Sequence, residues 1–336
     1  MINLLLNKVV DKNDLTKEEA MSFMEEMLQG KLTISQTAAF LIALRMKGET
    51  VDEFLGFIKV MRKHMIKIKT QGLVIDTCGT GGDGKGTFNI STAVAFVVAG
   101  AGVKVAKHGN RAASSLCGSA DVLEALGVSI NLSPKQAEEM LQKTGFTFLF
   151  APLYHPAMKY VASVRKELKI RTVFNFLGPF VSPAQVKRQI IGVPNIELAE
   201  KLAEVGVNLG YEYLMLVSSE DGLDEISLSA PTHIFEVKGR DFKKSIVNPQ
   251  KLGFVKISFE KIKGGDAKTN AESIQNILKG QNGPERDIVI LNSAIALYVA
   301  GRTKTIEDGV IMAKNAIDSG KAKKVLQDAV KYSNNL

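Results

Sequence analysis

Residues 76–92 read DTCGTGGDGKGTFNIST and place five glycines between Gly79 and Gly86, with an aspartate inside the cluster. Glycine loses more conformational freedom on folding than any other residue, so such a run indicates positive φ angles or the close approach of a ligand. Exposed N–H groups in a loop that leads into a helix attract anions, which makes phosphate the first candidate, with a plain flexible turn as the alternative. The stretch lacks the Gly-Lys-Ser/Thr ending of a Walker loop and the spacing of the dinucleotide fingerprint.

The sequence around this stretch alternates short β-branched runs with helical patterns from Leu73 onward. The strand-like runs are LVID, VKVAKH and FTFLFAP, and the helical ones begin at about Ser91 and continue with GSADVLEALG and INLSPKQAEEMLQKTG. EYLMLVSS, THIFEV and DIVILNSAIALYVAG extend the pattern towards the C-terminus. Such alternation predicts an α/β fold with a central, mainly parallel sheet, right-handed crossovers and flanking helices.

The first 70 residues predict a small all-helical domain. Three helix-start signals of the capping-box form recur there: Thr16 with Glu19, Thr33 with Gln36, and Thr50 with Glu53. Gly48 is expected to end the second of these helices. We predict that the buried face of that helix consists of Ala38, Leu41, Ile42 and Met46.

The length of 336 residues, with 45% hydrophobic content, supports two domains rather than one. Prolines and a glycine in the segment 171–188 break the strand–helix alternation, and we predict that this segment joins the helical domain. The predicted division is 1–70 with 171–188 for the helical domain, and 71–170 with 189–336 for the α/β domain.

The net charge of +8 permits an anionic partner, but the positive charge is spread over segments of mixed sign without a basic tail. An ordinary basic protein is the simpler interpretation, and nucleic acid is not an expected partner. The two cysteines, Cys78 and Cys117, have neither zinc-site nor disulfide-framework spacing, which fits a reducing cytoplasm. No signal peptide and no membrane span is expected.

Ligands of an open parallel sheet bind outside the carboxyl ends of its strands, so residues just after each strand are candidates for chemistry. After the glycine loop, three polar residues can cap the next helix, or can hold a phosphate or a magnesium-bound water with the same atoms. These are Asn89, Ser91 and Thr92.

A second candidate follows VKVA, where KHGNRAASSLCGS collects cationic and hydrogen-bonding groups. They are Lys107, His108, Asn110 and Arg111, followed by a small-residue loop with Ser114, Ser115, Gly118 and Ser119. Alone, this pattern is more often a solvated turn; beside the glycine loop, it favours a binding site.

A third candidate binding region is FAPLYHPAMKYVASVRKEL, where a predicted strand ends and a helix begins. Its candidate ligand-binding cation is Arg165. On a helical wheel it lies beside Met158, about 70° from the centre of the apolar stripe. That stripe consists of Ala157, Val161, Val164 and Leu168. Arg165 is either an arginine that snorkels past the edge of the core or a guanidinium aimed at a carboxylate.

The run DGLDEIS carries the adjacent acids Asp224 and Glu225. A glycine-containing turn with two acids is more often a surface loop than a metal site. Beside a phosphate site, however, hard oxygen ligands indicate Mg²⁺, which keeps its waters and uses only one or two carboxylates.

Taken together and in this order, these motifs resemble those of the anthranilate phosphoribosyltransferases. The resemblance runs from LRMKGET through GTGGD, KHGNR, HPAMK, RTVFNFLGP and DGLDEIS to ILNSAIALYVAG, and it covers nearly the whole chain. One departure is LGPFVSP, where members usually have LGPLxNP, so Phe180 and Ser182 replace Leu and Asn. This departure leaves the selectivity of the anthranilate side open.

The resemblance implies a helical domain with an α/β domain, a homodimer formed through the helical domain, and a cytoplasmic enzyme. It implies the second committed step of tryptophan biosynthesis, in which anthranilate and phosphoribosyl pyrophosphate give N-(5-phosphoribosyl)anthranilate and pyrophosphate. Magnesium, with two ions expected, would accompany the phosphoribosyl pyrophosphate.

Site roles follow from the same resemblance. Phosphoribosyl pyrophosphate would contact Gly79, Thr80, Gly81, Gly82, Asp83, Thr87, Asn89, Ser91, Thr92, Lys107 and Ser119. Anthranilate would contact Gly79, His108, Asn110, His155, Arg165 and Gly178, with Arg165 on its carboxylate. Magnesium would be held by Ser91, Asp224 and Glu225. No residue is assigned as a certain catalyst; His108 is the candidate general base, and the reaction does not require one.

Two alternatives share the architecture. A pyrimidine nucleoside phosphorylase would carry a KH-x-x-R element, but it would have serine at Gly109 and would lack the HPAMK and LGP motifs. A nucleic-acid-binding relative would be expected to lose parts of GTGGD or DGLDE, and both motifs are intact here.

Overall fold

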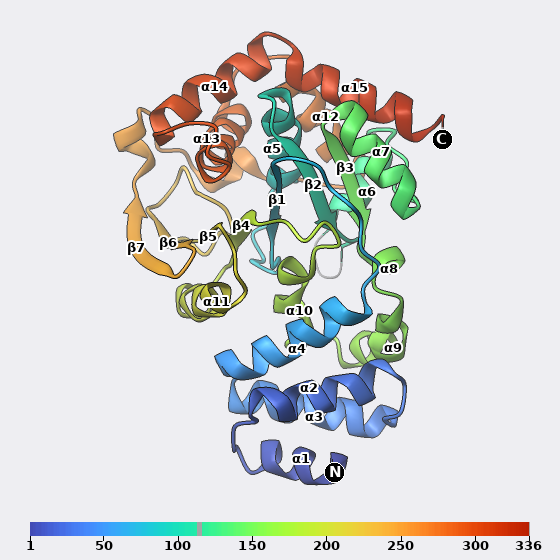
Figure 1. The fold of residues 1–336 in the computed structure, drawn as a ribbon. Coiled ribbons are helices and arrows are strands. Elements are labelled where there is room, and N and C mark those ends of the chain that lie inside the picture. The colour runs from blue at the N-terminus through green and yellow to red at the C-terminus, as the bar shows by residue number, and fades with distance from the viewer. Residues whose placement is uncertain (113–115, 336) are drawn as a thin grey trace. The chain divides into compact units, whose positions relative to one another are not determined.

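The computed structural model describes residues 1–112 and 116–335, and Ser114 and Ser115 therefore lie outside the described residues. The chain forms two compact units (Figure 1). Unit 1, the helical unit, comprises Met1–Lys67 and Pro152–Pro183; unit 2, the α/β unit, comprises Ile68–Ala151 and Ala184–Leu336. These boundaries correct the predicted 171–188 segment: the return to the helical unit begins at Pro152, because the helix Lys159–Leu168 packs on the N-terminal helices.

The helical unit is built from two stretches of chain. The first contains α1 (Ile2–Val10), α2 (Lys17–Leu28), α3 (Ile34–Lys47) and α4 (Val51–His64). The second contains η1 (Pro156–Met158), α9 (Lys159–Leu168), α10 (Phe174–Leu177) and η2 (Gly178–Val181), and the short α8 (Ala151–Tyr154) precedes them at the boundary. The three predicted capping boxes are confirmed at the starts of α2, α3 and α4.

Aromatic residues fill the core of the helical unit. The rings of Phe23 and Phe40 stack with centroids 3.6 Å apart, and Phe57 meets Phe40 edge-on at 6.2 Å. The predicted buried face of α3 is confirmed only in part: Leu41 is buried, but Met46 is 74% exposed, and the buried row is Thr37, Phe40, Leu41 and Leu44. The buried row is rotated around the helix axis relative to the predicted one. The reason is that Phe40 has the largest apolar surface on this helix, so burying its ring next to Phe23 gives the largest stabilisation.

The α/β unit is organised around a seven-stranded sheet in the order β3-β2-β1-β4-β5-β6-β7. The strands are β1 (Val74–Gly79), β2 (Lys104–Gly109), β3 (Phe146–Phe150), β4 (Arg188–Gly192), β5 (Tyr213–Ser219), β6 (Thr232–Lys238) and β7 (Asp241–Val247). In the sheet order, all neighbouring pairs from β3 to β5 are parallel, whereas the pairs β5–β6 and β6–β7 are antiparallel. The predicted α/β class with a mainly parallel sheet is thus confirmed; β4 had not been recognised as a strand.

Helices cover the sheet. They are α5 (Ile90–Gly100), α6 (Ser119–Ala125), α7 (Pro134–Thr144), α11 (Ile196–Asn208), α12 (Ala267–Leu278), α13 (Pro284–Val299), α14 (Ile306–Asp318) and α15 (Lys321–Ser333), with short turns η3 (Pro249–Leu252) and η4 (Phe259–Ile262). The apolar run of 287–301 therefore forms the central helix α13, which packs against α5. The helix α11 packs on β5 and β6 on the side away from α13 (Figure 1).

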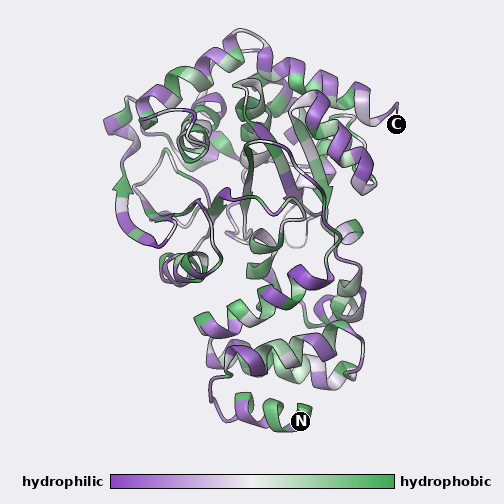
Figure 2. Ribbon diagram, viewed as in Figure 1, coloured by the Kyte–Doolittle hydropathy of each residue, from purple (hydrophilic) through white to green (hydrophobic). Residues whose placement is uncertain are grey.

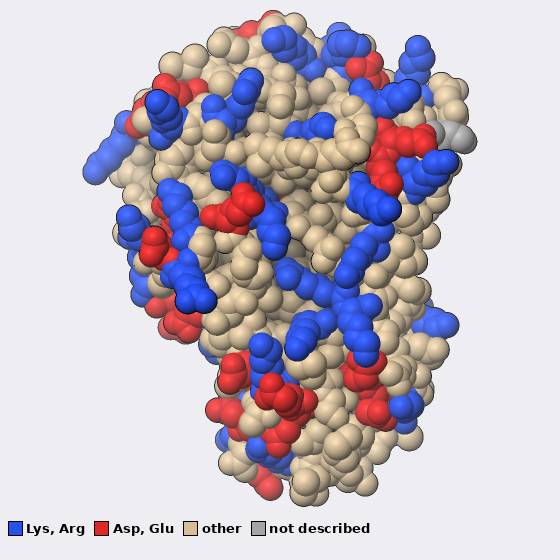
Figure 3. All heavy atoms as spheres, viewed as in Figure 1, with Lys and Arg blue, Asp and Glu red and all other residues tan. Residues whose placement is uncertain are grey.

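Hydropathy follows this layering. Hydrophobic residues dominate α5, whereas α14 and α15 alternate in hydropathy along their length (Figure 2). On the face of the α/β unit in Figure 3, Lys and Arg side chains lie with Asp and Glu among them. Among the described residues, no helix has both the length and the apolar character needed to cross a membrane.

Candidate active site at the ends of strands β1 and β4

The strand order reverses between β1 and β4, because the chain runs from β1 outward to β2 and β3 and then returns to β4 on the other side. Such a switch point leaves a crevice at the carboxyl ends of the two strands, where ligands of open α/β sheets bind. Both strands end on glycine, and Gly79 is paired with Gly192 in the register. The glycine loop therefore begins at the place where this topology favours a ligand.

The glycine loop owes its shape to positive φ angles. Gly81, Gly82, Gly84 and Gly86 have φ between 63° and 75°, a region that L-residues with side chains avoid. A Cβ atom added at Gly81, Gly84 or Gly86 would meet no heavy atom within 4 Å. The glycines are thus required by backbone conformation, and open space lies beside the loop. Asp83 is only partly exposed, and its Oδ1 accepts the N–H of Lys85 at 3.1 Å.

The start of α5 corrects one expectation about Asn89. Asn89 is the N-cap residue, but its side chain accepts no capping hydrogen bond. Instead, its Nδ2 donates to the carbonyl of Cys117 at 3.2 Å and its Oδ1 accepts from Asn270 at 2.9 Å. Thr92 is fully buried, and its hydroxyl finds no hydrogen-bond partner within residues 1–112 and 116–335. Thr87 makes an isolated bridge with Lys263, which holds the end of the glycine loop.

Lys107 joins β2 to the neighbouring strand β1 and to the start of α5. It is 2% exposed, and its Nζ donates to the Thr77 carbonyl at 2.5 Å and to Ser91 Oγ at 3.0 Å. Ser91 is therefore held by a buried cation, with its hydroxyl oxygen at the mouth of the α5 N-terminus. Two predicted phosphate-side residues are thus brought together.

Asp76 is a buried acid beneath this site to which sequence analysis assigned no role. Its Oδ1 accepts the N–H of His108 and its Oδ2 accepts from Gln189, both at 3.3 Å; Tyr211 in turn donates to Gln189 at 2.8 Å. Burial raises the pKa of Asp76 to about 6, and the nearby charge of Lys107 opposes that rise. An aspartate inside the apolar run LVID was the signal that could have identified it.

The acidic pair lies in the loop after β5. Asp224 Oδ2 accepts the N–H of Gly81 at 3.0 Å, so this loop is joined directly to the glycine loop. Burial and the neighbouring charge of Asp224 raise the pKa of Glu225 well above its ordinary value; the charge of Lys107 opposes the rise and that of Asp83 adds to it. Carboxylates therefore lie close together in this loop, beside the glycine loop.

These donors fit magnesium. No group of three or more His, Cys, Asp and Glu side chains in the described part of the chain is arranged to hold a metal. Magnesium does not need such a cage, since it binds through one or two carboxylates, waters and substrate phosphates. Two adjacent carboxylates, with an elevated pKa at Glu225 and the Ser91 hydroxyl nearby, form a set of hard oxygen donors that a divalent cation would stabilise.

The loop after β2 brings Asn110 and Ser119 together. Ser119 Oγ donates to the Asn110 carbonyl at 3.3 Å, and a Cβ at Gly109 would lie 2.2 Å from Ser119 Oγ. A side chain at Gly109 would therefore require Ser119 or Phe148 to shift. Arg111 is engaged by Asp121 and Glu124, so its charge is already paired.

The other predicted anthranilate residues lie in the helical unit. His155 is buried, and burial lowers its pKa to about 4, partly offset by its hydrogen bond with the Val181 backbone. The guanidinium of Arg165 lies over the Phe174 ring, 5.6 Å from the centroid, and burial lowers its pKa. No carboxylate of the described residues lies within 4 Å of it, so the guanidinium has no internal counter-ion. Gly178 opens η2, and a Cβ there would meet nothing within 4 Å.

Phe180 and Ser182, the two residues that differ from the usual LGPLxNP motif, are both buried in the helical unit. The Phe180 carbonyl accepts a hydrogen bond from Arg62 Nε at 2.8 Å, which ties η2 to α4. The departure from the usual motif therefore falls at two buried positions of the helical unit.

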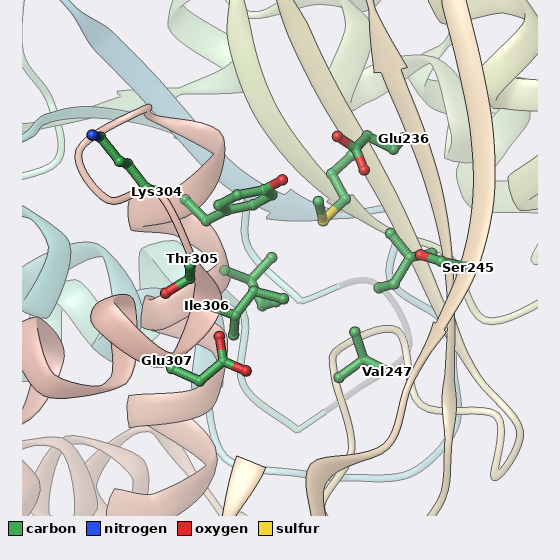
Figure 4. A pocket seen from close by; sticks show the side chains of 11 residues that line it. Glu236, Ser245, Val247, Lys304, Thr305, Ile306 and Glu307 are labelled. Carbon is green, nitrogen blue, oxygen red and sulfur yellow. The ribbon is translucent and has the colours of Figure 1, made fainter. Parts of the chain in front are cut away.

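A separate pocket of about 280 Å³ lies between β6 and β7 on one side and α13 and α14 on the other (Figure 4). Its labelled side chains include Glu236, Ser245 and Glu307, and none of its lining residues was predicted as a site residue. Glu236 is already engaged by Tyr213, whose hydroxyl donates at 2.6 Å, and by Lys238. This pocket belongs to the antiparallel end of the sheet and contains none of the switch-point groups.

Comparisons with known proteins match the whole chain. Residues 4–65 match the model described as "Glycosyl transferase family, helical bundle domain", and residues 71–323 match "Glycosyl transferase family, a/b domain". The chain is 46% identical to an anthranilate phosphoribosyltransferase of Dehalococcoides mccartyi over 338 residues, which covers 100% of this chain and 99% of that relative.

Solved structures give the same result. The crystal structure of the Thermus thermophilus anthranilate phosphoribosyltransferase matches with a TM-score of 0.92 and 37% identity, over 98% of this chain and 99% of that one. The Saccharomyces cerevisiae enzyme, in complex with phosphoribosyl pyrophosphate and Mg, matches with a TM-score of 0.92 and 26% identity, over 100% of this chain and 98% of that one. The chain described here therefore belongs to the anthranilate phosphoribosyltransferase family.

Proposed function

We propose that this chain transfers the 5-phosphoribosyl group from phosphoribosyl pyrophosphate to the amine of anthranilate, with release of pyrophosphate, as a step of tryptophan biosynthesis. One observation carries the proposal at the level of residues. The Asp224 carboxylate accepts the N–H of Gly81 at the switch point, which joins the glycine loop to the acidic pair. A magnesium–pyrophosphate group needs both elements side by side: N–H groups for phosphate oxygens and carboxylates for the cation.

On the phosphate side, the chain offers mainly backbone. N–H groups from the loop, together with hydroxyl and cationic side chains, would bind the pyrophosphate and the ribose. The proposed set is Gly79, Thr80, Gly81, Gly82, Asp83, Thr87, Asn89, Ser91, Thr92, Lys107 and Ser119. Within it, Asn89 and Thr92 would act by shaping the start of α5, because Asn89 is engaged by Asn270 and Thr92 is buried.

Magnesium is the proposed cofactor, with two ions held by Ser91, Asp224, Glu225 and the phosphates. When bound, it neutralises charge on the departing pyrophosphate. Asp224 would be prepared for this role by its contact with the Gly81 N–H, which holds its carboxylate beside the glycine loop. Lys107 keeps the Ser91 hydroxyl oriented by donating to its oxygen, which leaves the hydroxyl proton free to turn away from a cation.

Each unit, taken by itself, supplies some of the proposed anthranilate contacts. Gly79, His108 and Asn110 come from the α/β unit, and His155, Arg165 and Gly178 come from the helical unit. Arg165 is proposed to bind the anthranilate carboxylate, because its guanidinium has no counter-ion among the described residues and an aromatic ring supports it from one side.

The chain's part in the reaction is positioning and electrostatics. Positive charge develops on the ribose as pyrophosphate leaves, and the fixed N–H groups of the glycine loop stabilise the negative charge on the leaving group without reorganising. The anthranilate amine is neutral at pH 7 and loses its proton late, so no strong general base is needed. His108 could accept that proton, but its ring is largely buried.

Two further proposals concern assembly and compartment. Helices α1 and α3 pack together, and large apolar side chains on them are exposed, with Leu4 at 72%, Ile34 at 58% and Met46 at 74%. Such exposure supports a homodimer through the helical unit. Cys78 and Cys117 are both free thiols, which supports a reducing, cytoplasmic location.

A fluorescence assay tests the proposed reaction. Anthranilate fluorescence should fall only when phosphoribosyl pyrophosphate and Mg²⁺ are both present, and phosphorolysis of pyrimidine nucleosides should be absent. A filter-binding measurement with single-stranded DNA should show no retention. Retention of DNA without consumption of anthranilate would contradict the proposal.

A further inference from the structure

The carboxylates of the acidic pair lie in a connection of twelve residues, 220–231, between β5 and β6. A connection of this length needs fixed points if two carboxylates are to occupy one geometry. Part of the fixation is internal: Ser227 Oγ donates to Asp221 Oδ2 at 2.6 Å and accepts the N–H of Ser229 at 2.8 Å. These bonds shape the loop but do not attach it to the rest of the unit.

Asn292 on α13 attaches the loop from one side. Its Oδ1 accepts the N–H of Ile226 at 2.9 Å, and its Nδ2 donates to the carbonyl of Ile226, also at 2.9 Å. The same Nδ2 donates to the Ile288 carbonyl one turn earlier in α13, again at 2.9 Å. One amide side chain thus pairs with both polar groups of the residue that follows Glu225, in the manner of a β-bridge.

The attachment is buried. Asn292 is 5% exposed and Ile226 is 1% exposed, so water does not replace these hydrogen bonds when they are lost. The third bond, to the helix's own backbone, fixes the rotamer of Asn292 and removes its freedom to follow the loop.

Two strand-end glycines stop the loop from the other side. A Cβ at Gly192 would lie 1.6 Å from the Asp224 carbonyl oxygen, and one at Gly79 would lie 2.5 Å from Asp224 Oδ2. The backbone of Asp224 therefore packs directly on the end of β4, and its carboxylate packs on the end of β1. Asn292 prevents the loop from moving away from α13, and the glycines set how far it extends over the strands.

We propose that Asn292 is a positioning residue for the metal-binding carboxylates: it fixes the backbone at Ile226 so that Asp224 and Glu225 are held in one arrangement before Mg²⁺ and phosphoribosyl pyrophosphate arrive. The inference rests on the proposed function, since it takes this pair as the magnesium ligands. Magnesium demands near-ideal octahedral geometry, and groups that orient its ligands affect its binding even without touching the ion. Asn292 itself touches neither substrate nor metal in this assignment.

The test compares five full-length proteins: wild type, Asn292→Ala, Asn292→Asp, Leu291→Ala and the double variant Asp224→Ala/Glu225→Ala. Asn292→Asp keeps the volume and the acceptor but loses both N–H bonds to carbonyls. Leu291→Ala is the matched control, because it removes buried volume from the adjacent position of α13 and none of the hydrogen bonds to Ile226.

Two readouts are used besides turnover. The first is amide hydrogen exchange of peptides spanning 222–230 in the ligand-free protein, and the second is calorimetric binding of phosphoribosyl pyrophosphate in the presence of Mg²⁺. Both Asn292 variants should exchange faster at 222–230 and bind about ten- to a hundred-fold more weakly. Leu291→Ala should lower the melting temperature and leave both readouts unchanged.

The outcomes separate the inference from the function it rests on. If the double variant loses binding while both Asn292 variants bind as wild type, or exchange at 222–230 as wild type, the inference is overturned and the proposed function stands. Equal weakening by Leu291→Ala would also overturn it, because the effect would then come from the stability of α13. If the double variant itself binds as wild type, the metal assignment of the proposed function fails, and the role of Asn292 fails with it.

Discussion

The two units of the chain offer proposed binding groups of different kinds, which we call the phosphate side and the acceptor side. On the phosphate side, the α/β unit presents backbone: four glycines with positive φ, and two strand-end glycines that leave room for Asp224. On the acceptor side, the helical unit presents side chains, such as Arg165 over the Phe174 ring. A backbone site depends on where the chain itself can pass, so a Cβ added at Gly79 or Gly192 would collide with Asp224. A side-chain site loses only the contact that is removed.

The largest effect is expected from removing the acidic pair. Asp224→Ala/Glu225→Ala should reduce kcat/KM by about a thousand-fold or more, because these carboxylates are the proposed cation ligands. Anthranilate fluorescence in a Mg²⁺ titration measures it. Glu220→Ala removes an exposed acid from the same loop and should be silent. Wild-type activity of the double variant at limiting Mg²⁺ would contradict the assignment of Asp224 and Glu225 as cation ligands.

A glycine exchange on each side sharpens the comparison. Gly192→Ala places a Cβ 1.6 Å from the Asp224 carbonyl oxygen and must displace the acidic loop, which should weaken binding of phosphoribosyl pyrophosphate about a hundred-fold. Gly178→Ala meets open space and should leave that affinity unchanged. Calorimetry measures both, with circular dichroism to verify folding. Equal behaviour of the two variants would remove the distinction between the sides.

Substitution of Arg165 tests the acceptor side, where the proposed contacts are made by side chains. Arg165→Met should raise the KM for anthranilate about ten- to a hundred-fold, as expected for loss of a charged hydrogen-bonded pair, with the KM for phosphoribosyl pyrophosphate unchanged. Lys166→Met is the control, since Lys166 is exposed on the same helix. A rise in the KM for phosphoribosyl pyrophosphate instead would place Arg165 on the phosphate side.

The smallest effect concerns the pH dependence of stability. Burial lowers the pKa of His155 to about 4, whereas the unfolded chain titrates near 6.5, so the unfolded state binds more protons between these values. The free energy of unfolding should therefore fall as pH drops through this window, by about 1 kcal/mol at pH 5.5 from this residue alone. His155→Gln should remove that part of the slope.

Urea unfolding at pH 7.5 and pH 5.5 measures this slope. The readout is the difference between the free energies of unfolding at the two pH values. Packing lost in the variant changes both free energies equally, because that contribution does not depend on pH. Asp76, whose raised pKa gives a slope of opposite sign, is present in both proteins and cancels. An unchanged slope in His155→Gln would show that the histidine is not neutral in the folded protein.

Sequence alone predicted the local parts of this structure well, because local signals are physical. Thr16, Thr33 and Thr50 start their helices as capping boxes since the partner lies three residues away. The buried face of α3 could be predicted only in part, because it depends on the ring of Phe23 from another helix. For the same reason β4 was missed: its strand character comes from its neighbours β1 and β5.

The site residues also divide into those with a local sequence signal, which could be identified, and those that act through distant contacts, which could not. GTGGD and DGLDEIS were identifiable because glycine runs and adjacent acids have few other uses in such surroundings. Gly192 and Asn292 were not, since each acts through a contact with a residue far away in the sequence. Asn89 was identified as a polar residue at a helix start, but its bond with Asn270 of α12 replaced the expected cap.

The central claim is that phosphoribosyl pyrophosphate is bound by the backbone loop and the acidic pair without help from the acceptor side. Calorimetric titration of phosphoribosyl pyrophosphate with Mg²⁺, in the absence of anthranilate, tests it in wild type, Arg165→Met and Asp224→Ala/Glu225→Ala. The account predicts wild-type affinity for Arg165→Met and loss of binding for the double variant. Loss of binding in Arg165→Met, with binding retained in the double variant, would contradict it.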